Sequence, residues 1–310
     1  MMKKKEPLVI RFRSHIPPAY MAQFPPGRRY LAASPSEALT IIAGQPDDYG
    51  ICLANPPEFV LNQLKDRAKK TENIILFYDL LPKPEECSTL SSFHVMVPSL
   101  CFYYFFRQHG VNAKLVNLLS LLKIDRIERT KQTEENLPSR KKICLWIDER
   151  LIAPCYQTEI ARVISALLKK YHSGLNVIWV SEKKRHFSSA GVHLLRADNV
   201  GRIKEWQKAN IILTLGSSFQ SLVSLHLQFL SRGIAVITDD RGDHCEWVNH
   251  LFTGFVLGRK GTCKELGRYL LRMLKDPGLL QRFHENGPLL LERVIQTGNE
   301  TSTGQFGHSS

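Results

Sequence analysis

The chain has 310 residues, of which 43% are hydrophobic, and a formal net charge of +13 at pH 7. This length allows a sizeable core and favours two domains. No run of 18 or more apolar residues occurs, and only Leu8–Ile10 separates the basic start from Arg11. We therefore expect neither a transmembrane helix nor a signal peptide.

The seven cysteines are scattered and form no Cys-x-x-Cys pair. This usage predicts reduced thiols in a cytoplasmic protein, with no metal site and no cofactor. The positive charge fits an anionic nucleotide, a nucleic acid or the inner surface of a membrane as partner. The basic residues lie in many short clusters, not in one arginine-rich arm, which disfavours nucleic acid. A generally basic solvated surface is the plain alternative.

Strand-like and helix-like segments alternate along the chain. In the first half we expect strands over 8–12, 49–54, 73–78 and 93–97, and helices over 34–42 and 56–67, followed by an aromatic run over 102–106. After a charged linker over 124–142, we expect strands over 142–147, 176–180, 191–195, 211–215 and 234–238, and helices over 157–171, 200–208, 219–231 and 264–277. Alternation at this interval predicts parallel sheets flanked by helices.

The predicted fold class is α/β, with two Rossmann-like, doubly wound domains. The boundaries are residues 1–135 for the first domain and 136–297 for the second. The polar segment 298–310 is predicted to be a disordered tail.

The segment Leu215-Gly-Ser-Ser-Phe-Gln220 is a strand-to-helix corner. Gly216 allows close backbone approach, and the N–H groups of Ser217, Ser218 and Phe219 at a helix start can hold a phosphate. Gln220 and Gln228 are eight residues apart, about two helical turns, and so lie near one helix face. The alternative is an amphipathic core helix with both glutamines on its rim.

The elements after this corner run helix, Arg232-Gly233, strand, Thr238-Asp239, Glu246-Trp-Val, then Gly254-Phe-Val-Leu-Gly258. This order resembles the nucleotide-sugar half of the family 4 (group 1) retaining glycosyltransferases. The resemblance implies the GT-B fold, in which two domains face each other across a cleft, and a nucleotide-diphosphate sugar as donor. That family usually has Glu where this chain has Gln220 and Gln228, the first meeting the donor sugar and the second the ribose.

Two other features of the resembling family are missing. The Gly-Arg pair after the first strand of the second domain is replaced by Trp146-Ile-Asp-Glu-Arg150, and a later Gly-x-Gly by Ser181-Glu-Lys-Lys-Arg185. Arg150, Lys183 and Lys184 follow strand ends and are the candidates to replace the diphosphate contacts. Ordinary exposed surface cations are the alternative.

The first half offers three candidates for the acceptor side. Tyr78 and Asp79 follow a predicted strand, where the resemblance implies residues that touch the reacting sugar. His15 follows the first strand, in place of the family's Gly-rich loop. Each has the alternative of a structural strand-end residue or a satisfied histidine.

Three functional hypotheses follow. The first is a glycosyltransferase that moves a sugar to a hydroxyl acceptor, such as a glycan or lipid-linked acceptor in envelope or surface glycan assembly. The second is a catalytically weakened GT-B-like subunit that binds nucleotide or a partner, favoured by the two glutamines. The third is basic nucleic-acid binding, which predicts a steep loss of affinity with salt.

The run Gly242-Asp-His-Cys-Glu246 also suggests a metal site or a Cys nucleophile, with a turn as the simpler interpretation.

Overall fold

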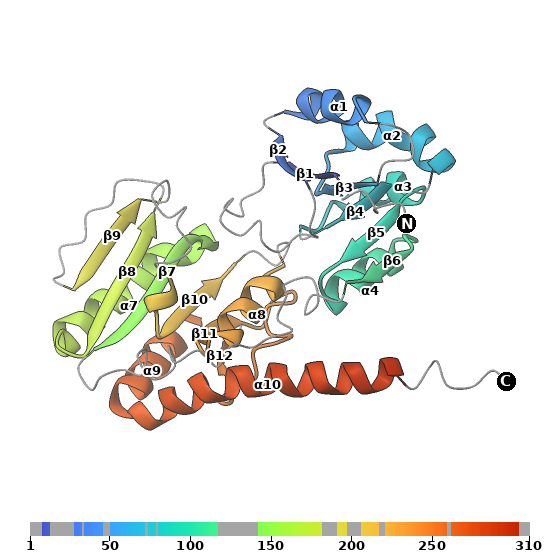
Figure 1. Ribbon diagram of the computed structural model, residues 1–310. Helices are drawn as coiled ribbons and strands as arrows, with labels where there is room; N and C mark the ends of the chain where they lie inside the picture. The colour runs from blue at the N-terminus through green and yellow to red at the C-terminus, as the bar shows by residue number, and fades with distance from the viewer. Residues whose placement is uncertain are drawn as a thin grey trace. The chain divides into compact units, whose positions relative to one another are not determined.

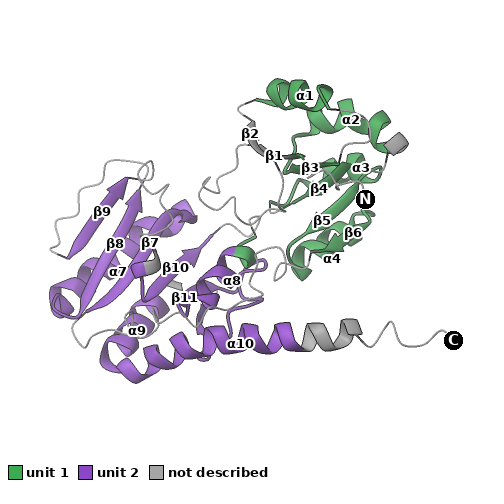
Figure 2. Cartoon of the chain, viewed as in Figure 1, with its two compact units in different colours: residues 1–122, 218–224 green, residues 123–217, 225–310 purple. Residues whose placement is uncertain are grey.

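The computed structural model of the chain describes residues 8–12, 28–32, 34–45, 50–71, 74–78, 80–116, 142–181, 191–196, 206–216, 221–258 and 262–303. It divides into two compact units (Figure 2). The first comprises residues 1–122 and 218–224, and the second residues 123–217 and 225–310. The predicted boundary at 135/136 lies outside the described residues.

The first unit contains a six-stranded parallel sheet with the strand order β2-β1-β3-β4-β5-β6 (Figure 1). Its described elements are β1 (Leu8–Phe12), β2 (Arg28–Ala32), α1 (Pro35–Ala43), β3 (Ile51–Ala54), α2 (Glu58–Thr71), β4 (Ile74–Phe77), η2 (Pro84–Glu86), α3 (Cys87–Leu90), β5 (His94–Val97), α4 (Leu100–Gln108) and β6 (Ala113–Leu115).

Two of these helices, α1 and α4, begin at a serine that caps the first turn. The side chains of Ser34 and Ser99 each accept a hydrogen bond from a backbone N–H three residues on, at 3.2 Å. Such caps satisfy an N–H group that the first turn of a helix leaves free. The aromatic run predicted over 102–106 is helical, and the rings of Phe102 and Phe106 are fully buried in the core of this unit.

The second unit contains a separate six-stranded parallel sheet with the order β12-β11-β10-β7-β8-β9 (Figure 1). Its described elements are β7 (Ile143–Ile152), α7 (Pro154–Tyr171), β8 (Leu175–Ser181), β9 (Val192–Arg196), η4 (Trp206–Lys208), β10 (Ile211–Leu215), α8 (Val223–Ser231), β11 (Ala235–Asp239), β12 (Gly254–Leu257), α9 (Thr262–Lys275) and α10 (Pro277–Thr303).

The two faces of this second sheet are covered by different helices. Alternate residues of β10, Ile211, Leu213 and Leu215, share one core cluster with apolar residues of α7, α9 and the first turns of α10. Side chains of a strand alternate between faces, so Thr214 lies on the other face, where its hydroxyl contacts His226 of α8. Both faces are therefore buried, as expected for a parallel sheet.

The predicted α/β class with two parallel sheets is confirmed. Strands β2 and β6 were not predicted, and several predicted elements differ at their ends. The described part of α8 begins at Val223, β7 continues five residues past the predicted end at Ile147, and α10 runs on to Thr303, into the segment predicted as a tail. A single glycine such as Gly298 costs a helix only about 1 kcal/mol relative to alanine, which does not force an end. Residues 304–310 lie outside the described residues.

Within the described residues, no helix is long and apolar enough to cross a bilayer.

Candidate functional site

The second sheet has a point where the order of its strands reverses. The chain goes from β7 to β8 and β9 on one side, then returns to the other side of β7 for β10, β11 and β12. In open parallel sheets, ligands bind beyond the carboxyl ends of the strands at such a reversal. We therefore expect a ligand-binding site at the carboxyl ends of β7, β10 and β11.

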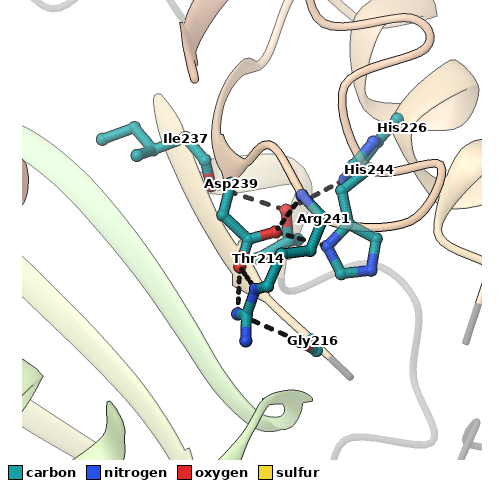
Figure 3. A network of polar contacts seen from close by, with 7 residues as sticks. All are labelled: Thr214, Gly216, His226, Ile237, Asp239, Arg241 and His244. Carbon is teal, nitrogen blue, oxygen red and sulfur yellow. Dashed lines mark hydrogen bonds and ion pairs between the residues drawn. The ribbon is translucent and has the colours of Figure 1, made fainter. Parts of the chain in front are cut away.

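Asp239, the last residue of β11, holds the guanidinium of Arg241 (Figure 3). Arg241 donates from Nε to Asp239 Oδ2 at 2.7 Å and from Nη2 to the same oxygen. Nη2 also donates to the backbone oxygen of Gly216, directly after β10, at 3.3 Å. The guanidinium carbon lies 4.8 Å from the centre of the Tyr156 ring, in the first turn of α7. Arg241 thus links the ends of two strands with the start of a helix.

A buried histidine holds Asp239 from the other side. His244 Nδ1 donates to Asp239 Oδ1 at 2.6 Å, and both side chains are inaccessible to solvent or nearly so. Burial alone raises the pKa of Asp239, but the hydrogen bonds and charges of His244 and Arg241 outweigh it, so the pKa is lowered overall. A carboxylate only accepts hydrogen bonds, so Nδ1 of His244 carries a proton. Asp239 is therefore an ionised group that fixes Arg241.

Thr214 and His226 lie beneath this pair, on the α8 side of the sheet. Thr214 Oγ1 is 2.9 Å from His226 Nε2 and 3.4 Å from the carbonyl oxygen of Ile237 (Figure 3). Complete burial, together with the neighbouring His244, lowers the pKa of His226 to about 3. His226 is therefore neutral at physiological pH, so it adds a polar side chain but no charge below Asp239.

A second aspartate and arginine pair lies in the last part of β7. Arg150 donates from Nε to Asp148 Oδ1 at 2.9 Å and from Nη2 to Oδ2 at 2.7 Å. Between them, Glu149 accepts from Trp179 Nε1 at 2.8 Å and from Ser181 Oγ at 2.6 Å, both in β8. Three consecutive charged residues in the last part of β7 are thereby held in defined geometry.

Three of the predicted site residues lie among the described residues of the second unit, namely Arg150, Gly216 and Gln228. Arg150 was expected to follow a strand but lies inside β7, two residues before its end, and Gly216 directly follows the adjacent strand β10. Arg150 is paired with Asp148 and its side chain is 12% exposed, so it is no ordinary surface cation. Gln228 lies on α8, where its Nε2 is buried without a hydrogen-bond partner among the described residues. Its backbone oxygen accepts from Ser231 and Arg232.

Tyr78 directly follows β4 in the first unit, and its side chain is buried in the core of that unit. Its ring centre is 5.4 Å from that of Phe106, and burial raises its pKa well above the usual range, with Glu86 and Cys87 adding to the effect. This placement favours the structural alternative for Tyr78. The other predicted site residues lie outside the described residues: His15, Asp79, Lys183, Lys184, Ser217, Ser218, Phe219 and Gln220.

The run Gly242–Glu246 forms turns, in which the N–H groups of His244 and Glu246 bond the carbonyl oxygens of Arg241 and Asp243. His244 donates to Asp239, and within the part of the chain that the structure describes, no three His, Cys, Asp or Glu side chains come together as metal ligands. The backbone of this segment is thus a turn, as its simpler interpretation had it.

Comparison with solved structures places this architecture among known ones. Anabaena HepE in complex with UDP aligns with a TM-score of 0.62 at 10% sequence identity, covering 97% of this chain and 100% of that one. The chain has the GT-B fold. WaaG, a glycosyltransferase involved in lipopolysaccharide biosynthesis, aligns at 0.57 and 10% identity over 92% and 95% of the two chains. Sucrose-phosphate synthase from Thermosynechococcus elongatus aligns at 0.54 and 11% identity over 97% and 100%.

The scan against protein-family models and the search of curated proteins found no match. At 10–11% identity the structural neighbours establish the GT-B fold, and the replacement of the two signature glutamates by Gln220 and Gln228 stays a prediction.

Sequence reasoning missed Asp239, Arg241 and His244 as a connected group. A signal for it was present: Asp148-Glu149-Arg150 and Asp239-Asp-Arg241 repeat the pattern Asp-acidic-Arg at two strand ends. In an extended segment, residues i and i+2 lie on the same side, so the spacing allows each arginine to return to its aspartate.

Proposed function

We propose that this GT-B protein transfers a sugar from a uridine-diphosphate sugar to a hydroxyl acceptor. The observation that carries the proposal is the near-complete alignment with HepE, a protein crystallised with UDP and with UDP-glucose. The second sheet adds support, because its polar groups gather at the strand-order reversal where nucleotides bind in such folds. A hexose such as glucose is the donor sugar that we propose.

The chemistry requires the leaving diphosphate to be stabilised. The bond between the anomeric carbon and the diphosphate oxygen breaks with its electrons on the diphosphate, the acceptor oxygen bonds to that carbon, and the acceptor proton passes to a base. Positive groups and N–H donors already fixed in place stabilise the developing charge without reorganising. Arg150 fits this role, since two hydrogen bonds to Asp148 fix its guanidinium. The corner after β10, which begins at Gly216, is proposed to supply backbone donors.

A binding test decides the nucleotide class. We expect UDP and UDP-glucose to raise the unfolding temperature, while ADP and GDP serve as matched controls that differ in the base. A ligand at one hundred times its dissociation constant adds about 2.7 kcal/mol to the free energy of unfolding. No stabilisation by any nucleotide of the panel would overturn the proposal.

A second candidate is a binding subunit with weakened catalysis. The observation that favours it is the pair Gln220 and Gln228, since an amide lacks the charge of the carboxylate expected by resemblance. UDP binding without release of UDP from UDP-glucose, in the presence of glycan or lipid-linked acceptors, would support this candidate. The double variant Gln220→Glu with Gln228→Glu then tests it further, because a gain in UDP release indicates a degraded enzyme.

The acceptor and the location are also proposals. The net charge of +13 suits an anionic surface such as the inner face of a membrane, and WaaG, one of the structural neighbours, is a glycosyltransferase of lipopolysaccharide biosynthesis. We propose a cytoplasmic protein that meets a glycan or lipid-linked acceptor at that surface. Co-sedimentation with anionic but not with neutral vesicles is the expected result.

A further inference from the structure

Two Asp-x-Arg pairs flank the end of β10 in the second unit. Asp239 and Arg241 follow on from β11, and Asp148 and Arg150 lie in β7, the strands on either side of β10. Neighbouring strands are about 4.8 Å apart, so the two pairs belong to strands separated by roughly 10 Å. Gly216, directly after β10, lies between these strands in the sheet order.

The pair on the β11 side keeps donors that the protein does not use. Arg241 Nε and Nη2 bond Asp239 and Gly216, but among the described residues no acceptor pairs with Nη1. A guanidinium has five N–H donors, two of them on Nη1. The side chain is 23% exposed, whereas Asp239 is 1% exposed. The carboxylate is thus buried behind the guanidinium, and the guanidinium keeps access to solvent.

Arg241 is also held on its flat face. The Tyr156 ring lies 4.8 Å from the guanidinium carbon, and His244 fixes Asp239 in turn. An arginine fixed in this way loses little conformational entropy when it binds an anion. The guanidinium is always charged, and its Nη1 still offers two N–H donors to phosphate oxygens.

We propose that Arg241 is a binding residue for the diphosphate of the nucleotide-sugar donor, with Asp239 and His244 as positioning residues. This inference rests on the proposed function, because it assigns a ligand within the same site. The diphosphate oxygens accept hydrogen bonds from the two N–H groups of Nη1, while Nε and Nη2 keep their bonds to Asp239 and Gly216. Arg241 therefore discriminates ligands by their phosphates and not by their base.

The experiment compares UDP with uridine by calorimetric titration of the full chain. Arg241→Gln is expected to weaken UDP binding by about 10- to 100-fold, the usual range for a lost charge-assisted hydrogen bond. Uridine binding is expected to stay within about twofold, since uridine has no phosphate. Arg241→Lys, which keeps a charge but not the fork, is expected to fall between wild type and Arg241→Gln.

Arg268 provides a matched control. It lies 5.1 Å from the centre of the Tyr269 ring and pairs with Glu265 at 3.6 Å, so it repeats the tyrosine and carboxylate environment on α9, away from the strand ends. Arg268→Gln is expected to leave both affinities unchanged.

Loss of Arg241 also removes one of the two partners of the buried Asp239 carboxylate. This lowers the free energy of unfolding of the second unit. The double variant Asp239→Asn with Arg241→Gln removes that unpaired charge and is expected to show the same selective loss of UDP binding. A measurement on the unchanged protein is independent of folding. UDP, but not uridine, is expected to protect Arg241 from phenylglyoxal, with Arg268 modified at the same rate in both cases.

The outcomes separate the two proposals. If wild type binds neither UDP nor UDP-glucose, the proposed function fails. If wild type binds UDP, and the Arg241 variants bind UDP as tightly as wild type or lose UDP and uridine equally, this inference fails and the proposed function stands. Protection of Arg241 by uridine alone would equally overturn the diphosphate assignment.

Discussion

Two buried histidines of the second unit, His226 and His284, have lowered pKa values that make its stability depend on pH. Burial lowers the pKa of His284 to about 4, and burial together with His244 lowers that of His226 to about 3. In the unfolded chain a histidine has a pKa of about 6.5. Between that value and the folded-state values, the unfolded state binds more protons, so the folded state loses stability as pH falls.

The magnitude follows from the same values. Between pH 7.5 and pH 5, each histidine costs about 2 kcal/mol of the free energy of unfolding, because protons bind the unfolded imidazole and not the folded one. Together the two lower it by about 4 kcal/mol, a large part of the 5–15 kcal/mol typical of a domain. Both side chains are at most 6% exposed, so solvent screens this effect little.

Urea unfolding followed by tryptophan fluorescence measures this effect in the right place, since Trp146, Trp179, Trp206 and Trp247 all belong to the second unit. His284→Leu is expected to remove about half of the pH dependence, because Nε2 of His284 has no hydrogen-bond partner among the described residues and an apolar side chain leaves nothing unpaired. His193→Leu, at an exposed position, is the control. A free energy of unfolding equal at pH 7.5 and pH 5, or a full pH dependence in His284→Leu, would refute the reasoning.

Three further predictions concern packing and chemistry elsewhere in the chain. A Cβ at Gly254 would lie 1.9 Å from a backbone oxygen of β11, so Gly254→Ala should destabilise the second unit by about 3 kcal/mol or more in urea unfolding. The control Gly174→Ala, whose Cβ would have no atom closer than 3.8 Å, should change the free energy of unfolding little. Glu149→Gln places an amide donor among two existing donors and should cost about 2–3 kcal/mol by the same measurement; an unchanged midpoint would contradict the hydrogen-bond geometry. A thiol reagent should label exposed Cys155 in the native protein but not Cys52, whose pKa burial raises to about 12; early labelling of Cys52 would show that β3 is open to solvent.

The sequence was most informative where elements are long and buried. The strand over 211–215 was predicted with its observed bounds, because β-branched and leucine residues run between polar ends. Both edge strands of the first sheet, β6 and β2, were missed for a physical reason. β6 has three residues, Ala113–Leu115, and β2 reads Arg-Arg-Tyr-Leu-Ala, so neither carries an apolar run long enough to stand out from a loop. Their conformation depends on pairing with a neighbour, which a local pattern does not contain.

The site was less predictable because its residues act in pairs. From the sequence, Arg150 is a cation after a strand; in the structure it shares its charge with Asp148, two residues earlier. The same holds for Asp239, which sequence reasoning passed over in favour of the His-Cys-Glu run that follows. Which partner each group takes depends on where the backbone leaves the strand, and that is a property of the sheet.

This pairing changes how the charge of the chain bears on ligand binding. A net charge of +13 suggests an anion attracted by excess positive charge, yet the two arginines at the strand-order reversal are each matched by a buried aspartate. Attraction at this edge therefore comes from N–H groups aimed in fixed directions, which act at hydrogen-bond distance and are screened little by salt, and not from a long-range field. In the function that we propose, such a site recognises the geometry of a diphosphate, and association with an anionic acceptor surface is left to the net positive charge of the chain.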